Sequence, residues 1–220
     1  MSDMPISECQ CCGTCCKKGG PSFHHEDRRL IEQGSIPLKY LYTIRKGELA
    51  RDNVRDRLLP VDSDIIKIRG RNASWTCAFL DEQTCRCTIY EDRPIECRVL
   101  KCWDTRDIER IYAQNRLTRE DLLSGVAGLW EVIEEHASLC DYEKIGQLAA
   151  LLDGDGRETA LEGIRVAFAY DASLRSLSVQ EGRVRADMTD FLFGRPLTET
   201  IRMFGLKVAE SQDRFILSKI

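Results

Sequence analysis

Residues 9–16 read CQCCGTCC, which places five cysteines in eight positions around a single glycine. Thiols at this density are rarely needed to fill a core, so the stretch indicates a disulfide framework, a redox pair or a metal site. Five more cysteines follow between residues 77 and 102, and Cys140 stands alone in the second half. The chain is therefore interpreted from these two cysteine groups outward.

Composition favours the metal site among these three. With 220 residues, 43% hydrophobic and 31% charged, the chain is typical of a soluble globular protein. It lacks a secretory signal and any apolar run of the roughly 18 residues that span a membrane, so we expect a cytoplasmic location and no membrane partner. Disulfides are disfavoured there, and an odd total of 11 cysteines cannot pair completely.

The charge pattern argues against a nucleic-acid partner. The formal net charge is −4, and lysine and arginine are spread along the chain without a basic block. Proteins that bind nucleic acid usually carry such a block or a basic face. We therefore expect no nucleic-acid partner.

The spacing of the first cysteine group is typical of a cluster-binding loop. Cys9, Cys12 and Cys15 stand three residues apart, as in bacterial ferredoxins, which take the fourth thiolate of a [4Fe–4S] cluster from elsewhere in the chain. Gly13 permits the close backbone approach that such a loop needs. Side chains of adjacent residues usually diverge, so Cys15 and Cys16 fit one mononuclear ion poorly. The pair favours a multinuclear centre or two metal sites.

The second group supplies the remaining thiolates. Structural zinc sites usually show two C-x2–4-C knuckles, and among the later cysteines only Cys97 and Cys102 have that spacing. Zinc therefore stays open as an alternative, although the spacing does not select it.

These residues resemble a known family. The stretches Cys9-x2-Cys12-x2-Cys15-Cys16, CAFL from Cys77 and CTIYEDRPIECR from Cys87 are similar to the YkgJ-like cysteine-cluster family, whose signature is CxxCxxCC. That family is described as zinc- or iron-chelating, and the resemblance spans about residues 9–102. It implies eight metal-binding cysteines: Cys9, Cys12, Cys15, Cys16, Cys77, Cys87, Cys97 and Cys102.

Other candidate residues have weaker support. Cys11 and Cys85 fall outside the family pattern and could be spare or bridging thiolates. His24 and His25 begin an expected helix, where solvent-exposed side chains are favoured over ligands, although Asp27 could support a ligand role. Cys140 and His136 lie on an apolar helical stripe and are predicted to be core residues.

The expected fold is α+β, mainly α. Residues 1–105 are predicted to form a cysteine-cluster region and residues 106–220 a mainly helical region packed with it. The first region contains a helix after Ser22 that ends near Gly34, and short strands at 65–68, 75–80 and 86–90. Helical stripes follow over 129–140 and 145–152, with a further helix from 161. The DGDG sequence at 153–156 predicts a helix–helix turn, and residues 205–220 a terminal hairpin.

The functional hypothesis is a cytoplasmic protein that holds iron, as an iron–sulfur cluster, or zinc, with two metal sites plausible. One alternative is a structural zinc module whose helical region binds a protein partner. Another is an iron–sulfur redox or protein-modifying enzyme, because a related flagellin lysine methylase shares the cysteine motif. The sequence contains no G-x-S-x-G, Walker A, Rossmann or H-E-x-x-H motif. Catalytic residues, substrate and oligomeric state are left open.

Overall fold

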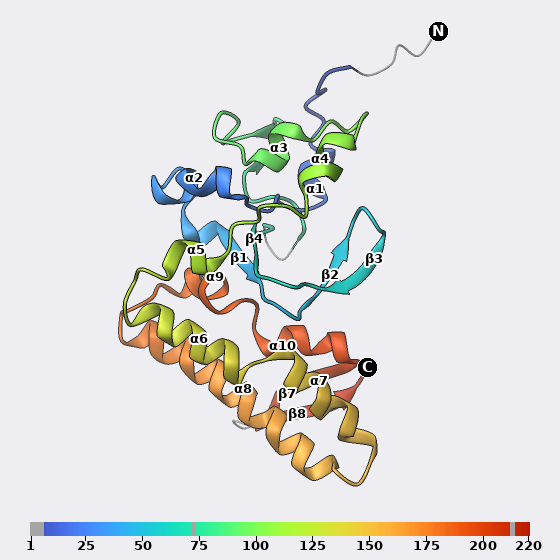
Figure 1. The fold of residues 1–220 in the computed structure, drawn as a ribbon, viewed down its shortest axis with the longest axis vertical. Coiled ribbons are helices and arrows are strands. Elements are labelled where there is room, and N and C mark those ends of the chain that lie inside the picture. Colours follow the sequence, from blue (N-terminus) through green and yellow to red (C-terminus); the bar gives the residue numbers. More distant parts are fainter. Residues whose placement is uncertain (1–6, 72–73, 212–213) are drawn as a thin grey trace. The chain divides into compact units, whose positions relative to one another are not determined.

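The computed structural model describes residues 7–71, 74–211 and 214–220, and its fold is α+β, mainly α, as predicted (Figure 1). The chain divides into two compact units. Unit 1 comprises residues 1–42 and 65–118, and unit 2 comprises residues 43–64 and 119–220. Ten of the eleven cysteines belong to unit 1, and Cys140 belongs to unit 2. No helix in the described ranges is long and apolar enough to cross a membrane.

Unit 1 is built from short elements around a small apolar core. Its described elements are α1 (Thr14–Lys17), η1 (His25–Asp27), α2 (Arg28–Glu32), η2 (Leu38–Tyr40), β4 (Ile65–Ile68), β5 (Leu80–Asp81), β6 (Arg86–Cys87), α3 (Ile95–Val99) and α4 (Arg106–Ile111). Strand β1 (Leu41–Ile44) begins in this unit and pairs with β4. The strand predicted at 65–68 and the helix after Ser22 are confirmed, and Gly34 follows α2 with a φ of +77°.

The strands predicted at 75–80 and 86–90 are much shorter in the structure. The short strands β5 and β6 pair, with Leu80 opposite Cys87, and Cys77 makes an isolated bridge to Gly70. The prediction was wrong for residues 75–79, because the Cys77 N–H donates to the Cys16 carbonyl at 2.8 Å instead of extending a ladder. It was also wrong for residues 88–90, which form a turn after β6. The backbone here is used to join the two cysteine groups.

The helices of unit 2 follow the predicted apolar stripes. They are α5 (Arg119–Leu123), α6 (Leu129–Leu139), α7 (Tyr142–Ala150), η3 (Leu151–Asp153), α8 (Arg157–Gln180), η4 (Ala186–Met188), α9 (Thr189–Phe193), α10 (Leu197–Thr200) and η5 (Ile201–Phe204). Helices α6 and α8 lie side by side (Figure 1). The carboxylate of Asp141 begins α7 by accepting from the Lys144 N–H at 2.9 Å, as an N-cap should. The turn predicted at 153–156 is confirmed.

Two antiparallel hairpins complete unit 2. Strands β2 (Leu49–Asp52) and β3 (Arg57–Pro60) form one, and β7 (Leu206–Ser211) and β8 (Arg214–Lys219) form the other. The second is the predicted terminal hairpin. Its apolar side chains pack on a buried cluster that includes Ile145, Ile164 and Phe168. Unit 2 therefore has an extensive apolar core of its own.

Candidate metal centre

A glycine in the left-handed backbone conformation forms the turn that carries the first cysteine group. Gly13 has a φ of +71°, and its carbonyl accepts from the Lys17 N–H at 3.0 Å, which starts α1. Glycine adopts this conformation without the steric cost that other residues meet. A Cβ on Gly13 would lie 3.5 Å from Leu80 and 3.9 Å from the Cβ of Cys85, so this turn packs on the β5–β6 hairpin.

The fold brings part of the second cysteine group to α1. The backbone bond from Cys77 to Cys16 joins segments that are 61 residues apart. The charges of Cys15, Cys16, Cys77, Cys87 and Cys97 act on one another's thiols. We call these five cysteines the inner thiol group. It unites residues from α1, the Cys77 bridge, β6 and α3.

Crowding and burial favour the protonated thiols of Cys16, Cys77 and Cys97. Burial raises the pKa of the Cys97 thiol well above its ordinary value, and the neighbouring Cys77 and Cys87 raise it further. Burial also raises the pKa of Cys77, and the hydrogen bond shared with Cys15 raises that of Cys16. Several thiolates can coexist in such a space only if a cation offsets their charge, so the group fits a metal that displaces the protons.

The two adjacent cysteines of α1 converge rather than diverge. Their Sγ atoms lie 4.0 Å apart, which corrects the expectation that Cys15 and Cys16 point apart. Two thiolates on one tetrahedral ion, with metal–sulfur bonds near 2.3 Å, stand about 3.8 Å apart. This pair can therefore share one metal atom.

The other predicted ligands lie further outward. Cys9 and Cys12 are exposed, and the Cys12 thiol lies 3.2 Å from the Thr14 hydroxyl. Cys102 is exposed as well. The charge of Cys15 links Cys12 to the inner thiol group.

The two cysteines outside the family pattern both adopt an uncommon backbone. Cys11 has a φ of +50° and Cys85 a φ of +54°. The charge of Cys9 raises the pKa of the Cys11 thiol, and the charge of Arg86 opposes this rise. The Cys85 thiol lies 3.8 Å from the Glu82 carbonyl. Both thus belong to the Gly13 turn and the hairpin beneath it.

His24 is buried and fully hydrogen-bonded, which corrects the expectation that it is exposed. Its Nδ1 lies 2.7 Å from the Gln114 carbonyl and its Nε2 lies 3.2 Å from the Glu96 carboxylate. Burial opposes the charged form, but these two bonds raise the pKa of His24 above its ordinary value. With both ring nitrogens engaged, His24 supports the cysteine region as a hydrogen-bonding residue. His25 is exposed, as expected.

Two arginines that flank Cys97 differ in their partners. The Arg93 guanidinium lies 3.4 Å from the centroid of the Tyr90 ring. The hydrogen bond with Cys16 is the main cause that lowers the pKa of Cys15 to about 6, and the charge of Arg93 lowers it further. Arg98 lies 3.8 Å from the buried Asp27 carboxylate. Arg93 therefore offsets thiolate charge, whereas Arg98 contributes to the support of α3.

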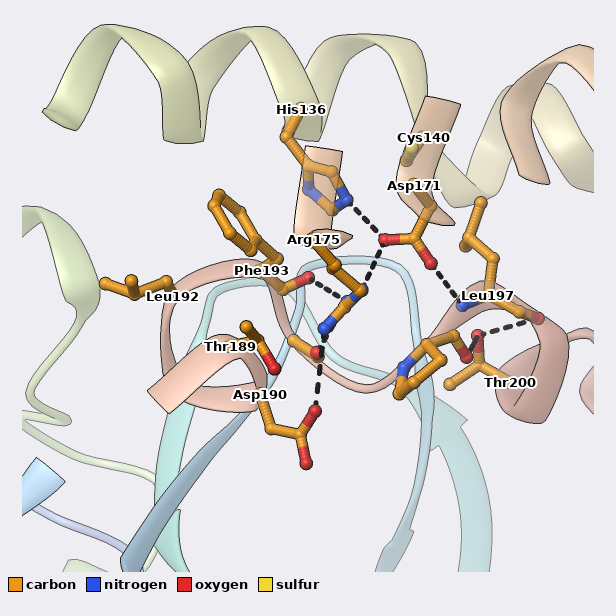
Figure 2. Close-up of polar contacts among 12 residues, drawn as sticks. His136, Cys140, Asp171, Arg175, Thr189, Asp190, Leu192, Phe193, Leu197 and Thr200 are labelled. Carbon is orange, nitrogen blue, oxygen red and sulfur yellow. Dashed lines mark hydrogen bonds and ion pairs between the residues drawn. The ribbon is translucent and has the colours of Figure 1, made fainter. Parts of the chain in front are cut away.

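Unit 2 holds a separate buried polar network. Figure 2 shows the Asp171 carboxylate between His136 Nε2 and Arg175 Nε, each 2.8 Å away, while its second oxygen accepts from the Leu197 N–H at 2.9 Å. The donor atoms of His136, Cys140 and Asp171 lie within 4.8 Å of one another. His136 and Cys140 are buried core residues, as predicted.

This network does not have the electrostatics of a metal site. Asp171 already uses both oxygens, and burial together with the charges of Arg45 and Arg175 lowers the pKa of His136 to about 4. The same two charges repel a metal cation. The Nδ1 of His136 also has no partner among the described residues, whereas metal-binding histidines donate their second nitrogen. We therefore assign the network a structural role. The sequence stripe did not indicate Asp171 or Arg175.

Comparison with known proteins agrees with the geometry. Residues 8–120 match one family model, described as "CxxCxxCC: Putative zinc- or iron-chelating domain". No curated protein and no solved structure matches the chain. The matched segment contains all ten cysteines of unit 1.

Proposed function

The chain belongs to the CxxCxxCC family and is a metal-binding protein, and we propose that it holds iron as an iron–sulfur cluster. The observation that carries this proposal is the spread of the inner thiol group. Its five thiols gather from four segments, yet among the described residues no three cysteine sulfurs lie within 4.8 Å of one another. A cluster distributes its thiolates over several metal atoms, so it suits a wide set of sulfurs better than a single ion does.

The inner thiol group provides the ligands of this centre. Cys15 and Cys16 bind one metal atom, since their separation of 4.0 Å suits two thiolates on the same atom. Cys97 and one of Cys77 and Cys87 bind the second iron atom, which makes up the four thiolates that hold a [2Fe–2S] cluster. Cys9 and Cys12, in the exposed loop before Gly13, and Cys102 complete the set of eight and serve a second metal site.

Zinc is the second candidate, and one observation favours it. The Cys15–Cys16 separation also equals, within a few tenths of an ångström, the edge of about 3.8 Å in a tetrahedral zinc–thiolate site. In that case zinc would stabilise unit 1, whose elements are short, without taking part in redox chemistry.

Anaerobic purification tests the choice of metal. We expect a brown protein with broad absorption near roughly 400 nm and with iron and acid-labile sulfide. A colourless protein with stoichiometric zinc would overturn the iron–sulfur proposal and select zinc. A protein that binds neither metal after anaerobic reconstitution would overturn both.

One substitution tests the number of sites. In Cys16→Ala we expect part of the metal to be lost while the rest stays bound, because Cys9 and Cys12 serve the second site. Complete retention would show that Cys16 is not a ligand, and complete loss would show a single centre. Cys140→Ala is the matched control because its thiol lies in unit 2.

A further inference from the structure

Helix α3 carries Cys97 but has little stability of its own. It contains only five residues, and Pro94 at its N-cap offers no side-chain hydrogen bond. Isolated helices of this length do not persist in water, because a first turn fixes several residues for one hydrogen bond. Something outside the helix must therefore fix the position of Cys97.

A buried carboxylate from another element caps α3. Asp27 Oδ1 accepts from the Ile95 N–H at 2.8 Å, which satisfies one of the free donors at the start of the helix. Its Oδ2 accepts from the His24 N–H at 3.1 Å. The Asp27 side chain has no exposed surface. One carboxylate thus joins α3 to the segment that begins α2.

A second carboxylate makes the same connection one residue later. Glu96 Oε2 accepts from the Ser22 N–H at 2.6 Å, and its Oε1 lies 3.2 Å from His24 Nε2. His24 is held in turn by the Gln114 carbonyl, and Ser22 accepts from the Lys67 ammonium at 3.2 Å. The residue next to Cys97 is therefore fixed from two sides.

We propose that Asp27 and Glu96 are positioning residues of the metal centre, which hold α3 so that the Cys97 thiol is already near Cys77 and Cys87 when the metal binds. This inference rests on the proposed metal-binding function. Neither carboxylate is a metal ligand, because their oxygens accept hydrogen bonds from backbone N–H groups and from an imidazole. Asp27 holds the backbone of α3 at the Ile95 N–H, and Glu96 holds α3 to the backbone of Ser22. Both therefore act on Cys97 through the position of the helix.

The physical consequence is a lower cost of assembling the site. A ligand that must be ordered on binding reduces affinity, whereas one held in place does not. Groups that orient ligands in this way typically contribute about 10- to 100-fold to metal affinity. The two variants Asp27→Asn and Glu96→Gln keep the shape of each side chain, but each places an amide N–H where one of the present donors is bound.

The test measures affinity for Zn²⁺ by competition with a chromophoric chelator, and the alkylation rate of Cys97 in the Zn²⁺-loaded protein by mass spectrometry. We expect each variant to bind about 10- to 100-fold more weakly. We also expect Cys97 to be alkylated at least about 10-fold faster, with Cys16 and Cys77 changing less. Glu91→Gln is the matched control, since it removes the same charge from an exposed side chain in the same segment.

The possible outcomes separate this inference from the proposed function. Unchanged affinity and unchanged Cys97 reactivity in both variants would overturn the inference, while wild-type protein that binds neither Zn²⁺ nor, after anaerobic reconstitution, an iron–sulfur cluster would overturn metal binding itself. A uniform rise in reactivity at all inner thiols would indicate general loosening and would also count against a positioning role. If Asp27→Asn does not fold, Glu96→Gln decides, because the Glu96 side chain is partly exposed.

Discussion

The two units of this protein hold their buried polar groups in opposite ways. In unit 1, thiols whose pKa values are raised by burial and by one another gather beside short elements. In unit 2, one buried carboxylate, Asp171, is matched by His136, Arg175 and a backbone N–H, and an apolar core surrounds long helices. The difference teaches that unit 2 offsets the charge of Asp171 with its own residues, whereas unit 1 gathers thiols of the kind that bind metal.

Metal removal should produce the largest difference between the two units in amide hydrogen exchange. Without metal, the inner thiol group no longer binds a common centre, so amide protons in residues 77–102 should exchange about 100-fold faster. Amides in α6 and α8 should change little, because their packing includes no ligand. Hydrogen–deuterium exchange with mass spectrometry measures both regions in one sample. Equal loss of protection in the two units would contradict the comparison, and added metal should restore the slow exchange.

The same substitution should have different effects in the two units. Cys97→Ala should remove most of the bound metal and destabilise unit 1. Cys140→Ala should leave the metal content unchanged and lower the free energy of unfolding by about 1 kcal/mol, since it removes only a small buried side chain. Metal analysis and chemical denaturation measure the two effects. A metal loss in Cys140→Ala would show that unit 2 contributes to the centre.

Acid should weaken unit 2 through His136. Its pKa is lowered to about 4 in the folded protein, mainly by burial, whereas an unfolded histidine titrates near 6.5. The unfolded chain therefore binds a proton that the folded chain does not, so stability present above about pH 6.5 is lost as the pH falls toward 4. We expect a loss of about 2 to 3 kcal/mol in this contribution. Denaturant unfolding monitored in unit 2 measures it.

A histidine substitution provides the control for this pH dependence. His136→Gln should flatten the fall between pH 6.5 and 4, although it also lowers stability at neutral pH by weakening the bond to Asp171. His25→Gln, at an exposed position in unit 1, should leave the slope unchanged. An unchanged slope in His136→Gln would assign the acid sensitivity to other groups.

Two glycines with a left-handed backbone conformation provide the test with the smallest expected effect. Gly13 has a φ of +71° and Gly182 a φ of +67°, so alanine should cost each about 1 kcal/mol of backbone strain. Only Gly13→Ala should also weaken metal binding, because Gly13 is the N-cap of α1, which carries Cys15 and Cys16, whereas Gly182 belongs to unit 2. Thermal unfolding and chelator competition distinguish the effects. Equal metal affinity in both variants would show that the Gly13 turn tolerates alanine.

The spacing of apolar residues predicted the secondary structure of unit 2 better than that of unit 1. The stripes that end in Cys140 and Leu152 gave α6 and α7, because a helix that buries one face repeats its apolar residues every three or four positions. The stretch 75–79 has the composition of a strand, yet its backbone bonds go to Cys16 and to a loop. Short elements held by distant partners carry no periodic signal, so their form could not be read locally.

By itself, the sequence determined the chemistry of the site: ten cysteines in one half, in two spaced groups, call for a metal in place of disulfides. It also determined the long helices and the terminal hairpin. Only the tertiary structure decided which thiols gather, that Cys15 and Cys16 converge to 4.0 Å, and that Asp27 and Glu96 secure α3. Ligand type is a property of single residues, whereas convergence depends on contacts between segments that the chain brings together only when it folds.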